Sequence, residues 1–531
     1  MKKYIVTFFL VTASLLSVQC SKQLDLVKQN AVDLDSYYAN ASDVDALSLS
    51  AYIYRAVCNN SGALWLDYLN NHSDDGYVYS GVNVTSANHQ SSQYFTHFYN
   101  INYLSNLIIE KLADDSAVKR QVIGEAYFWR AYAYVWLIRM WGNPPLVDHV
   151  LGSSELQPAN GETAALWDYV YTSLEKAVEL LPEKSGLGGQ RAIGGRVTKH
   201  SAYALLGKAK VIAGDYGGAV TALGKVISDG KYKLIDNFSD LYHVEADFCD
   251  EYMWEFNAND NSDVSTYVKE ADRRAVQLTW DSNGITVPGG VGELGTGSLC
   301  NVHQNFYDFM VARGEKGKAR YLGTVWDYED VLDQFVSQGL AASRNDAVSK
   351  FWKSNAVTTG QGYFRAKMLP KATDLYAYPH TTTDDIRCKS NWPGMRYAEV
   401  LLLYAEACIQ SGTGADQGLK ALNDVRSRAG LGTLASYVLQ DVKDEKRAEL
   451  AFEGERLWDL IRWGDASAAL AGRGHYSYQF FGYQKNTTKY DVRETEIPNA
   501  VGFEDRDKLC PYPYEEMQLN PDHLKQNPGW E

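Results

Sequence analysis

Residues 124–141 read GEAYFWRAYAYVWLIRMW and are apolar on nearly every face of the helix that they predict. The helical pattern extends over 118–141 and ends at Gly142-Asn143-Pro144-Pro145, because glycine followed by proline is a usual exit from a helix. A helix that is hydrophobic all round must be packed on several sides to keep its apolar faces out of water. This stretch therefore predicts the centre of an α-helical layer.

Further helical patterns flank this stretch on both sides. The sequence predicts helices at 103–113, 164–181, 197–213 and 216–227. The last two are joined by the short turn Gly214-Asp215. Their small residues recur at regular positions and are Ala202, Ala204, Gly207, Ala209, Gly218, Ala219 and Ala222. Small residues let paired helices approach closely, and such hairpins bury their remaining surface by stacking on neighbours. The expected fold class is mainly α, with a tetratricopeptide-like helical scaffold.

A loop-rich insertion divides this scaffold along the chain. Residues 235–390 carry short aromatic segments and Gly-rich runs, which predict long loops around short strands or helices. Helical patterns resume at 395–411, 416–429 and 442–463. The expected organisation is a single domain over 20–531, made of a helical scaffold (40–234 and 395–464), a loop-rich ligand-binding part (235–394) and an irregular C-terminal part (465–531). Loops held on a rigid scaffold are where binding usually resides.

The composition is that of a large acidic chain with many aromatic residues. Lys and Arg number 51 against 66 Asp and Glu, which gives a formal net charge of −15. This acidity argues against nucleic-acid binding, because affinity for phosphate backbones comes mainly from Lys and Arg. The 37 Tyr, 13 Trp and 17 Phe make up 13% of the chain. Tyr and Trp rings suit cores, protein interfaces and stacking against sugar rings alike.

The first twenty residues predict export. Met1-Lys2-Lys3 is a basic start, and the apolar run from Tyr4 to Leu16 is too short to span a bilayer as a helix. Cys20 follows shortly afterwards, which is typical of a bacterial lipoprotein signal in which residues 1–19 are removed and the cysteine is acylated. Acyl chains on Cys20 would anchor the protein stably to a membrane. The alternative is an ordinary signal peptide that is cut nearby, with an incidental cysteine.

Searches for catalytic and metal-binding motifs in the sequence find none with the required context. The sequence has no HExxH, Walker A or GxSxG motif, and Gly290 to Gly295 matches GxGxxG without a strand before it or a helix after it. The acidic pairs Asp74-Asp75 and Asp384-Asp385 could in principle serve a glycosidase, although solvated turns are the simpler interpretation. The histidines and the remaining cysteines show no ligand spacing. We expect no catalytic residues, no metal and no cofactor.

Longer segments resemble one family of proteins. Residues 125–146 resemble the signature helix of the SusD/RagB family, nutrient-binding outer-membrane lipoproteins of Bacteroidetes-type bacteria. Residues 395–407, MRYAEVLLLYAEA, residues 421–430, ALNDVRSRAG, and residues 446–464, KRAELAFEGERLWDLIRWG, resemble further family motifs in the family's order. The ending NPDHLKQNPGW at 520–530 is similar to the family's C-terminus. The resemblance therefore spans nearly the whole chain.

This resemblance implies a glycan-binding lipoprotein that is not an enzyme. Its location would be the outer membrane, held by a lipid anchor and exposed at the cell surface. Its partners would be an oligosaccharide and a TonB-dependent outer-membrane transporter of the SusC type, to which the captured oligosaccharide is delivered. One alternative is a peptide-binding uptake lipoprotein of the same family. A rival from another class is a secreted glycoside hydrolase, which the many aromatic and acidic residues would suit.

Charged residues in the third motif predict structure rather than catalysis. Glu449, Glu453 and Arg456 fall at i, i+4 and i+7 of the helix expected at 442–463, so they would share one face and form a charge network. Asp459 and Arg462 lie one turn apart on the same predicted helix. Such pairs, when partly buried, can fix how helices dock.

Two loop regions qualify as a sugar-binding face, because each combines aromatic rings with polar side chains. The early region, 70–79, offers Asp74, Asp75, Tyr77 and Tyr79. The later region offers Trp280 and Asn283, followed by a Gly-rich run over 289–297. The family resemblance also implies ligand contacts from roughly these two regions. The alternative is that these aromatic residues pack over the core, in which case the Tyr-rich segment 476–483 is the next candidate.

Overall fold

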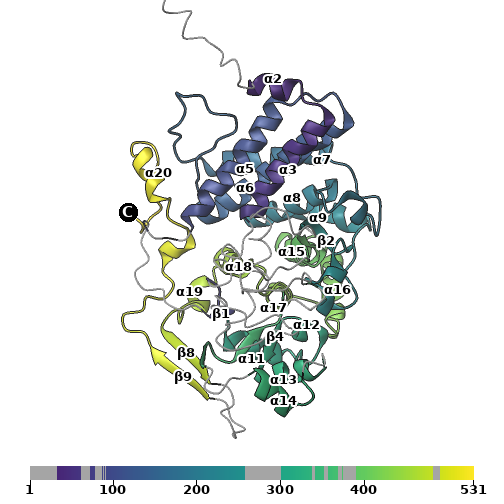
Figure 1. The fold of residues 1–531 in the computed structure, drawn as a ribbon, viewed down its shortest axis with the longest axis vertical. Helices are drawn as coiled ribbons and strands as arrows, with labels where there is room; N and C mark the ends of the chain where they lie inside the picture. Colours follow the sequence, from purple (N-terminus) through teal and green to yellow (C-terminus); the bar gives the residue numbers. More distant parts are fainter. Residues whose placement is uncertain are drawn as a thin grey trace, which may run out of the picture.

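Helices dominate the described part of the chain (Figure 1). The computed structural model describes residues 33–60, 72–77, 87, 89, 91–257, 301–337, 341–351, 357–368, 374, 390–481 and 491–531. The helices of the first half are α2 (Leu34–Ala39), α3 (Asp43–Asn60), α5 (Ser92–Lys111), α6 (Ala117–Trp141), α7 (Thr163–Leu180), α8 (Lys199–Ala213) and α9 (Tyr216–Ser228). The mainly α fold class predicted from the sequence is confirmed.

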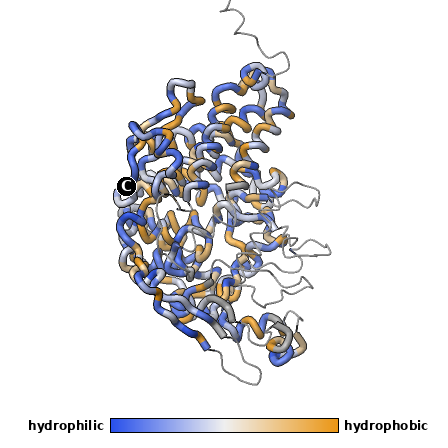
Figure 2. Tube along the Cα trace, turned by 60° about the vertical axis from the view of Figure 1, so that its left-hand side comes forward, coloured by the Kyte–Doolittle hydropathy of each residue, from blue (hydrophilic) through white to orange (hydrophobic). Residues whose placement is uncertain are grey.

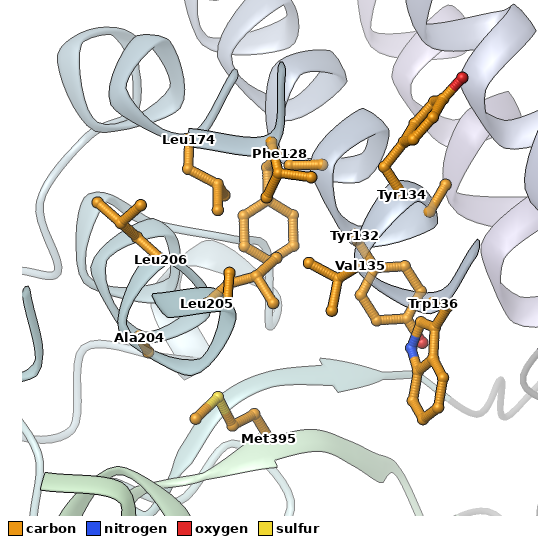
Figure 3. Packing of buried hydrophobic residues seen from close by; sticks show 14 of the residues in the cluster. Phe128, Tyr132, Tyr134, Val135, Trp136, Leu174, Ala204, Leu205, Leu206 and Met395 are labelled. Atoms are coloured by element: carbon orange, nitrogen blue, oxygen red, sulfur yellow. The ribbon is translucent and has the colours of Figure 1, made fainter. Parts of the chain in front are cut away.

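Helix α6 is the centre of the core, as its all-round apolar sequence predicts. Every residue from Phe128 to Trp141 is buried, and α3, α5 and α7 pack against the helix. Figure 3 shows Phe128 and Val135 of α6 pointing toward Leu205 of α8. Hydrophobic and hydrophilic residues are interspersed along the trace as a whole (Figure 2).

Helices α8 and α9 form the predicted hairpin. Gly214, at the end of α8, has a φ of 83°, a left-handed conformation that glycine adopts without strain. Gly207 allows the two helices to approach closely, because a Cβ at this position would lie 2.3 Å from Cγ of Leu223 on α9. The small residues in this hairpin are therefore needed for helix packing.

The second half of the scaffold packs directly on the first. Its helices are α15 (Tyr397–Ser411), α16 (Ala415–Arg428), α17 (Leu439–Glu449), α18 (Arg456–Trp463) and the short α19 (Ala466–Ala469). Helix α15 contacts α8 and α9, so segments from the two halves of the sequence lie side by side (Figure 1). Strand β2 (Tyr252–Phe256) pairs antiparallel with β7 (Trp392–Arg396) and brings the two ends of the insertion together.

Three predicted helix boundaries are wrong. The helix predicted at 103–113 is α5, which begins at Ser92. Residues 395 and 396 belong to strand β7, and helix α15 begins at Tyr397. The helix predicted over 442–463 is two helices, separated by a segment in which Phe452 has a φ of 62° and Gly454 a φ of 87°. The break places the Phe452 ring 5.1 Å from that of Phe306 in a second hydrophobic cluster. Tertiary packing thus overrides the local helical pattern.

Short elements make up the described part of the insertion, as the sequence predicts. They are β3 (Asn301–Val302), α11 (Gln304–Ala312), α12 (Ala319–Leu322), β4 (Val325–Asp327), α13 (Tyr328–Ser337), α14 (Arg344–Phe351), β5 (Val357–Thr359) and β6 (Tyr363–Arg365). The C-terminal part is more regular than predicted. Its strands β8 (Tyr476–Phe481) and β9 (Asp491–Glu496) join β5 in a three-stranded antiparallel sheet ordered β5-β8-β9.

Residues near the C-terminus cover the end of helix α6. The indole Nε1 of Trp141 donates to the carbonyl of Pro511 at 2.9 Å, and the amide of Cys510 donates to the carbonyl of Met140 at 2.6 Å. Asn527 Nδ2 donates to the carbonyl of Trp141 at 3.2 Å. The short helix α20 (Tyr514–Leu519) lies between these contacts in the sequence. Carbonyls at the end of α6, which the helix itself leaves without partners, are therefore satisfied by the C-terminal segment.

A buried charge network joins α17 to strand β7. Arg396 donates to Glu251 at 2.5 Å, to Glu449 at 2.9 Å and to Glu453 at 2.7 Å. The predicted network of Glu449 and Glu453 is confirmed, although the two do not share one helix face with Arg456. The break between α17 and α18 separates them, and Arg456 pairs elsewhere.

Within the described residues, no helix has both the length and the hydropathy that crossing a bilayer requires. The predicted signal segment 1–19 and Cys20 lie outside the described residues.

Candidate ligand-binding site

The structure brings part of the early predicted ligand-binding region next to the segment that follows the later one. Strand β1 (Gly76–Tyr77) pairs antiparallel with β3, so that Gly76 faces Val302 and Tyr77 faces Asn301. The amide of His303 then donates to the carbonyl of Asp75 at 2.8 Å and extends the pairing by one bond. Strand β1 leads into residues 78–86, and β3 follows residues 258–300. We refer to residues 74–77 and 301–303 as the β1–β3 platform.

Two arginines hold this platform onto the scaffold. Asp74 accepts from Nε and Nη2 of Arg456, both at 2.8 Å, in a bidentate pair. Asp75 accepts from Nη2 of Arg447 at 2.6 Å and from its Nε at 2.8 Å. Bidentate guanidinium–carboxylate pairs combine charge with fixed geometry. Because Arg447 lies on α17 and Arg456 begins α18, the platform is tied to the helices on both sides of the break.

The electrostatics of the two aspartates differ. Burial raises the pKa of Asp74, but the hydrogen-bonded Arg456 guanidinium outweighs it and holds the pKa below its usual range. Burial, together with the neighbouring Asp74 carboxylate, raises the pKa of Asp75 against the opposing effect of Arg447. Asp75 is 1% exposed. These carboxylates face arginines in the interior, an arrangement that suits an anchor for the platform.

An aromatic face on β8 adjoins the platform. The ring of His303 meets that of Tyr478 edge to face, with centroids 6.3 Å apart. Tyr476, two residues earlier on β8, lies 6.5 Å from Tyr478 between ring centroids and is 40% exposed. Residues two apart on a strand share one face of the sheet, so the two tyrosines form a continuous aromatic surface.

Carboxylates border this aromatic surface. Across the ladder, Tyr476 is opposite Glu496 and Tyr478 is opposite Glu494, and both glutamates are exposed. Directly opposed residues of antiparallel strands project to the same face. The face therefore presents flat rings beside hydrogen-bond acceptors. Such a combination can stack against the apolar face of a sugar ring and accept hydrogen bonds from its hydroxyls.

The structure places the predicted site residues unevenly. Asp74 and Asp75 lie in the platform with their carboxylates committed to arginines, and Tyr77 belongs to β1. Tyr79, Trp280 and Asn283 lie outside the described residues. A contact between any of these residues and a ligand remains a prediction.

Sequence reasoning missed the residues that hold the site together. His303, Arg447 and the Asp74–Arg456 pair have no signal in the local pattern, because the paired residues lie 382 positions apart. The alternation Tyr476-Ser477-Tyr478 does carry a strand signal, since it places both tyrosines on one side. In the described part of the chain, no group of three or more His, Cys, Asp or Glu side chains could hold a metal ion.

Comparison with known proteins gives consistent family matches. A family model described as the SusD family matches residues 251–530, and one described as starch-binding, associating with outer membrane, matches residues 22–211. A SusD-like protein of Bacteroides ovatus is 23% identical over 480 residues, which are 82% of this chain and 81% of the other. SusD-like protein P38 of Formosa agariphila is 23% identical, covering 88% of this chain and 92% of the other.

Solved structures share the fold. A laminarin-binding SusD-like protein has a TM-score of 0.71 at 24% identity, covering 92% of this chain and 99% of that one. Surface glycan-binding protein A from Bacteroides thetaiotaomicron, in complex with laminarihexaose, has a TM-score of 0.69 at 21% identity, covering 91% and 99%. At these identities the likeness establishes a common fold.

Proposed function

Because this chain belongs to the SusD family, we propose that it binds oligosaccharides at the aromatic face of β8 and the adjoining β1–β3 platform. The observation that carries the proposal is the pair Tyr476 and Tyr478, which lie side by side next to His303 and opposite two exposed glutamates. Sugar rings have apolar C–H faces and polar edges, and this surface offers a partner for each.

Two of the structural relatives support a glycan as the ligand class. One is a laminarin-binding protein, and the other is a glycan-binding protein in complex with laminarihexaose. Laminarin and its oligosaccharides are therefore the first probes to use. Tyr77 would add a contact from the platform itself, and Tyr79, Trp280 and Asn283 would add contacts from the regions that flank it. Asp74 and Asp75 would act indirectly, by holding the platform against Arg447 and Arg456.

We place the protein at the outer membrane, attached through acylated Cys20 and exposed at the cell surface. The family model described as associating with outer membrane supports this location. The function would be capture and delivery of the oligosaccharide to a TonB-dependent transporter of the SusC type. No bond would be made or broken, since recognition by stacking and hydrogen bonding needs no catalytic group.

Affinity electrophoresis tests the proposal. The mature chain is run in native gels that contain laminarin or one of a panel of other polysaccharides, with a peptide mixture tested separately by calorimetry. We expect retardation by at least one glycan and its loss in the Tyr476→Ala/Tyr478→Ala double variant. Tyr514→Ala is the matched control, because Tyr514 is 50% exposed but lies on α20.

Two results would contradict this function. Unchanged retardation of the double variant would remove the β8 face from the site. The second result is shortening of the glycan during incubation with the purified protein, as measured by chromatography of the products. It would show an enzyme instead of a binding protein.

A further inference from the structure

We propose that a cavity between α3 and α6 binds a single neutral sugar ring, as a second ligand site. The cavity has a volume of 250 Å³ and is lined by α3, α6, residues 194–197 and Asn257. No residue of the β1–β3 platform or of the β8 face contributes to it, so the inference goes beyond the proposed function. At about 30 Å³ per water molecule, the cavity has room for roughly eight waters, which suits one ring rather than a chain of rings.

The shape of the cavity follows from the elements around it. Helix α3 contributes Leu47, Ala51 and Tyr54 from one face, at the spacing i, i+4 and i+7. Glu125 and Trp129 of helix α6 form the floor of the cavity. They lie one turn apart, and each is 3% exposed. At the mouth, Leu47 is 41% exposed, and Ala51 is exposed as well. The cavity therefore opens to solvent beside α3 and closes against the core.

Two glycines keep the cavity open. Gly194 and Gly195 have φ values of 62° and 72°, the left-handed region that disfavours other residues. A Cβ on Gly195 would lie 2.9 Å from Oδ1 of Asn257, which is a close contact. This segment thus passes the cavity with backbone alone, and the space is built into the fold.

Aromatic rings form one corner of the cavity. The rings of Tyr54 and Trp129 have centroids 6.2 Å apart and are inclined at 58°. Trp129 is fixed from behind by Phe128 and Tyr132, whose rings meet it edge to face at 4.9 Å and 5.7 Å. A preformed ring surface of this kind offers a stacking face without ordering a side chain on binding.

The charges at the floor are already neutralised. Glu125 Oε1 accepts from Nε of Arg196 at 2.7 Å, and its other oxygen accepts from the hydroxyl of Ser50. The pair Glu125–Arg196 therefore leaves no net charge for a ligand to balance. A charged ligand would be attracted by one member of this pair and repelled by the other. The floor therefore favours a neutral ligand.

One donor and one acceptor at the cavity have no partner within the described part of the chain. They are Nη2 of Arg196 and Oδ1 of Asn257, both buried. The Asn257 side chain is oriented by its Nδ2, which donates to the carbonyl of Gly194 at 2.7 Å, and its backbone N–H donates to the hydroxyl of Tyr54 at 2.6 Å. A buried polar atom without a hydrogen bond destabilises the folded chain, so a ligand that satisfies both atoms gains from doing so.

Hydroxyl groups on an apolar ring match this set. A hydroxyl can accept from the Arg196 guanidinium and donate to the Asn257 carbonyl oxygen, while ring C–H groups stack against Trp129. A hydrocarbon would leave both polar atoms unsatisfied. A pyranose ring has both kinds of surface within the size of the cavity.

Binding of methyl hexopyranosides to the mature chain tests the inference. Methyl glucosides, galactosides and mannosides are titrated by ligand-observed NMR and calorimetry. We expect one of them to bind, and Ala51→Phe, which fills the mouth from an exposed helix position, to weaken it by roughly tenfold or more. Ser48→Phe is the matched control, because Ser48 is exposed on the same helix and does not line the cavity. Asn257→Ala should weaken binding by roughly tenfold through loss of one hydrogen bond.

A second pair of measurements separates this site from the β8 face. Tyr476→Ala/Tyr478→Ala should keep hexoside binding, and Ala51→Phe should keep retardation by the polysaccharide, which measures the proposed function on its own. The inference is overturned if no hexoside binds at concentrations up to about 50 mM. It is also overturned if the Ala51→Phe variant binds a hexoside as tightly as the wild type does. Equal binding of methoxycyclohexane, which has the ring and the methoxy group but no hydroxyl to donate to Asn257, would also overturn it.

Discussion

His89 lies between the scaffold and the C-terminal segment, in an environment that opposes its protonation. Its ring meets that of Trp530 edge to face, with centroids 5.3 Å apart, and its Nδ1 accepts from the amide of Ser91 at 3.2 Å. Burial and the nearby guanidinium groups of Arg473 and Arg506 lower the pKa of His89 from 6.5 to about 4. The folded chain therefore holds this imidazole neutral at pH values where the unfolded chain would protonate it.

This pKa difference predicts an acid-sensitive contribution to stability. Between pH 6.5 and pH 4 the unfolded state binds a proton at His89 that the folded state does not, so the free energy of unfolding falls as the pH falls. A difference of this size corresponds to about 3 kcal/mol across the interval. Urea unfolding of wild type and His89→Gln at pH 7, 6, 5 and 4 measures it, and the variant should lose less stability than the wild type.

His149 provides a control of opposite sign. It is exposed, and hydrogen bonds to Asp148 and Glu155 raise the pKa of its imidazole. His149→Gln should therefore make the loss of stability toward acid slightly steeper. Parallel pH profiles for wild type and His89→Gln would show that His89 does not carry the effect.

At the scale of elements, the break between α17 and α18 is held by charge. Glu449, the last residue of α17, is fully buried and accepts from Arg396 at 2.9 Å, from Arg320 at 3.2 Å and from Arg428. Burial raises the pKa of this carboxyl, but the guanidinium groups of Arg428, Arg396 and Arg320 outweigh it and hold the pKa well below its usual range. The carboxylate thus contacts three guanidinium groups in the interior and shares the compensation of their charge with neighbouring glutamates.

Glu449→Gln should destabilise the fold strongly. Removing one member of a buried ionic network leaves the remaining charges uncompensated, which typically costs about 3–5 kcal/mol. Because the folded-state pKa is depressed, the contribution of Glu449 is present above its unfolded pKa of 4.5 and is lost as the pH falls below that value. Urea unfolding at pH 7 should show the full difference between variant and wild type, and the difference should shrink below pH 4.5.

The surface pair Lys420–Asp424 gives the matched control, since its side chains are 75% and 43% exposed. Asp424→Asn should change the free energy of unfolding by less than about 1 kcal/mol. Equal effects of Asp424→Asn and Glu449→Gln would mean that the network contributes no more than an exposed ion pair.

The same elements show how far the sequence could predict this structure. Helix α6 is predictable because its apolar pattern and the exit at Gly142 are local, and the α8–α9 hairpin is predictable from its turn and small residues. Strand β7 is not, because the strand it pairs with, β2, lies about 140 positions earlier and the motif after it reads as helix. The reversal at Phe452 depends on a partner, Phe306, that no local pattern identifies.

The candidate site was predictable only in part. The structure places part of the early region, in β1, beside β3, which follows the later region, and ligand contact from either region stays a prediction. Strands of two residues have no periodicity, so this pairing could not be read from the sequence. The roles of Asp74 and Asp75 depend on Arg456 and Arg447, and only the folded chain brings these residues together.

At the scale of the whole molecule, the proposed location depends on the start of the chain. Cys20→Ala should release the protein from the membrane fraction of a bacterium that processes lipoproteins, because no acyl chain could then be attached. Cell fractionation followed by immunoblotting measures the change. Cys58→Ala is the control and should stay with the membrane.

Mass spectrometry of the mature N-terminus completes the test. A wild-type chain that is itself soluble, with a free N-terminus near residue 20, would identify an ordinary signal peptide. A Cys20→Ala variant that remains fully in the membrane fraction would show that anchoring does not depend on this cysteine.

The contact between residues 510–527 and the end of α6 has a consequence for the order of events during biogenesis. The hydrogen-bond partners of Trp141, Pro511 and Asn527, lie 370 and 386 positions later in the chain. The ribosome therefore synthesises them long after α6. A nascent chain therefore carries this central helix of the core for most of its synthesis without the segment that covers its end. For the proposed export as an extended polypeptide, this delay would be an advantage, because the contacts that cover the end of α6 form only after residues 510–527 have been made. It also exposes the translocating chain to aggregation and proteolysis until that moment.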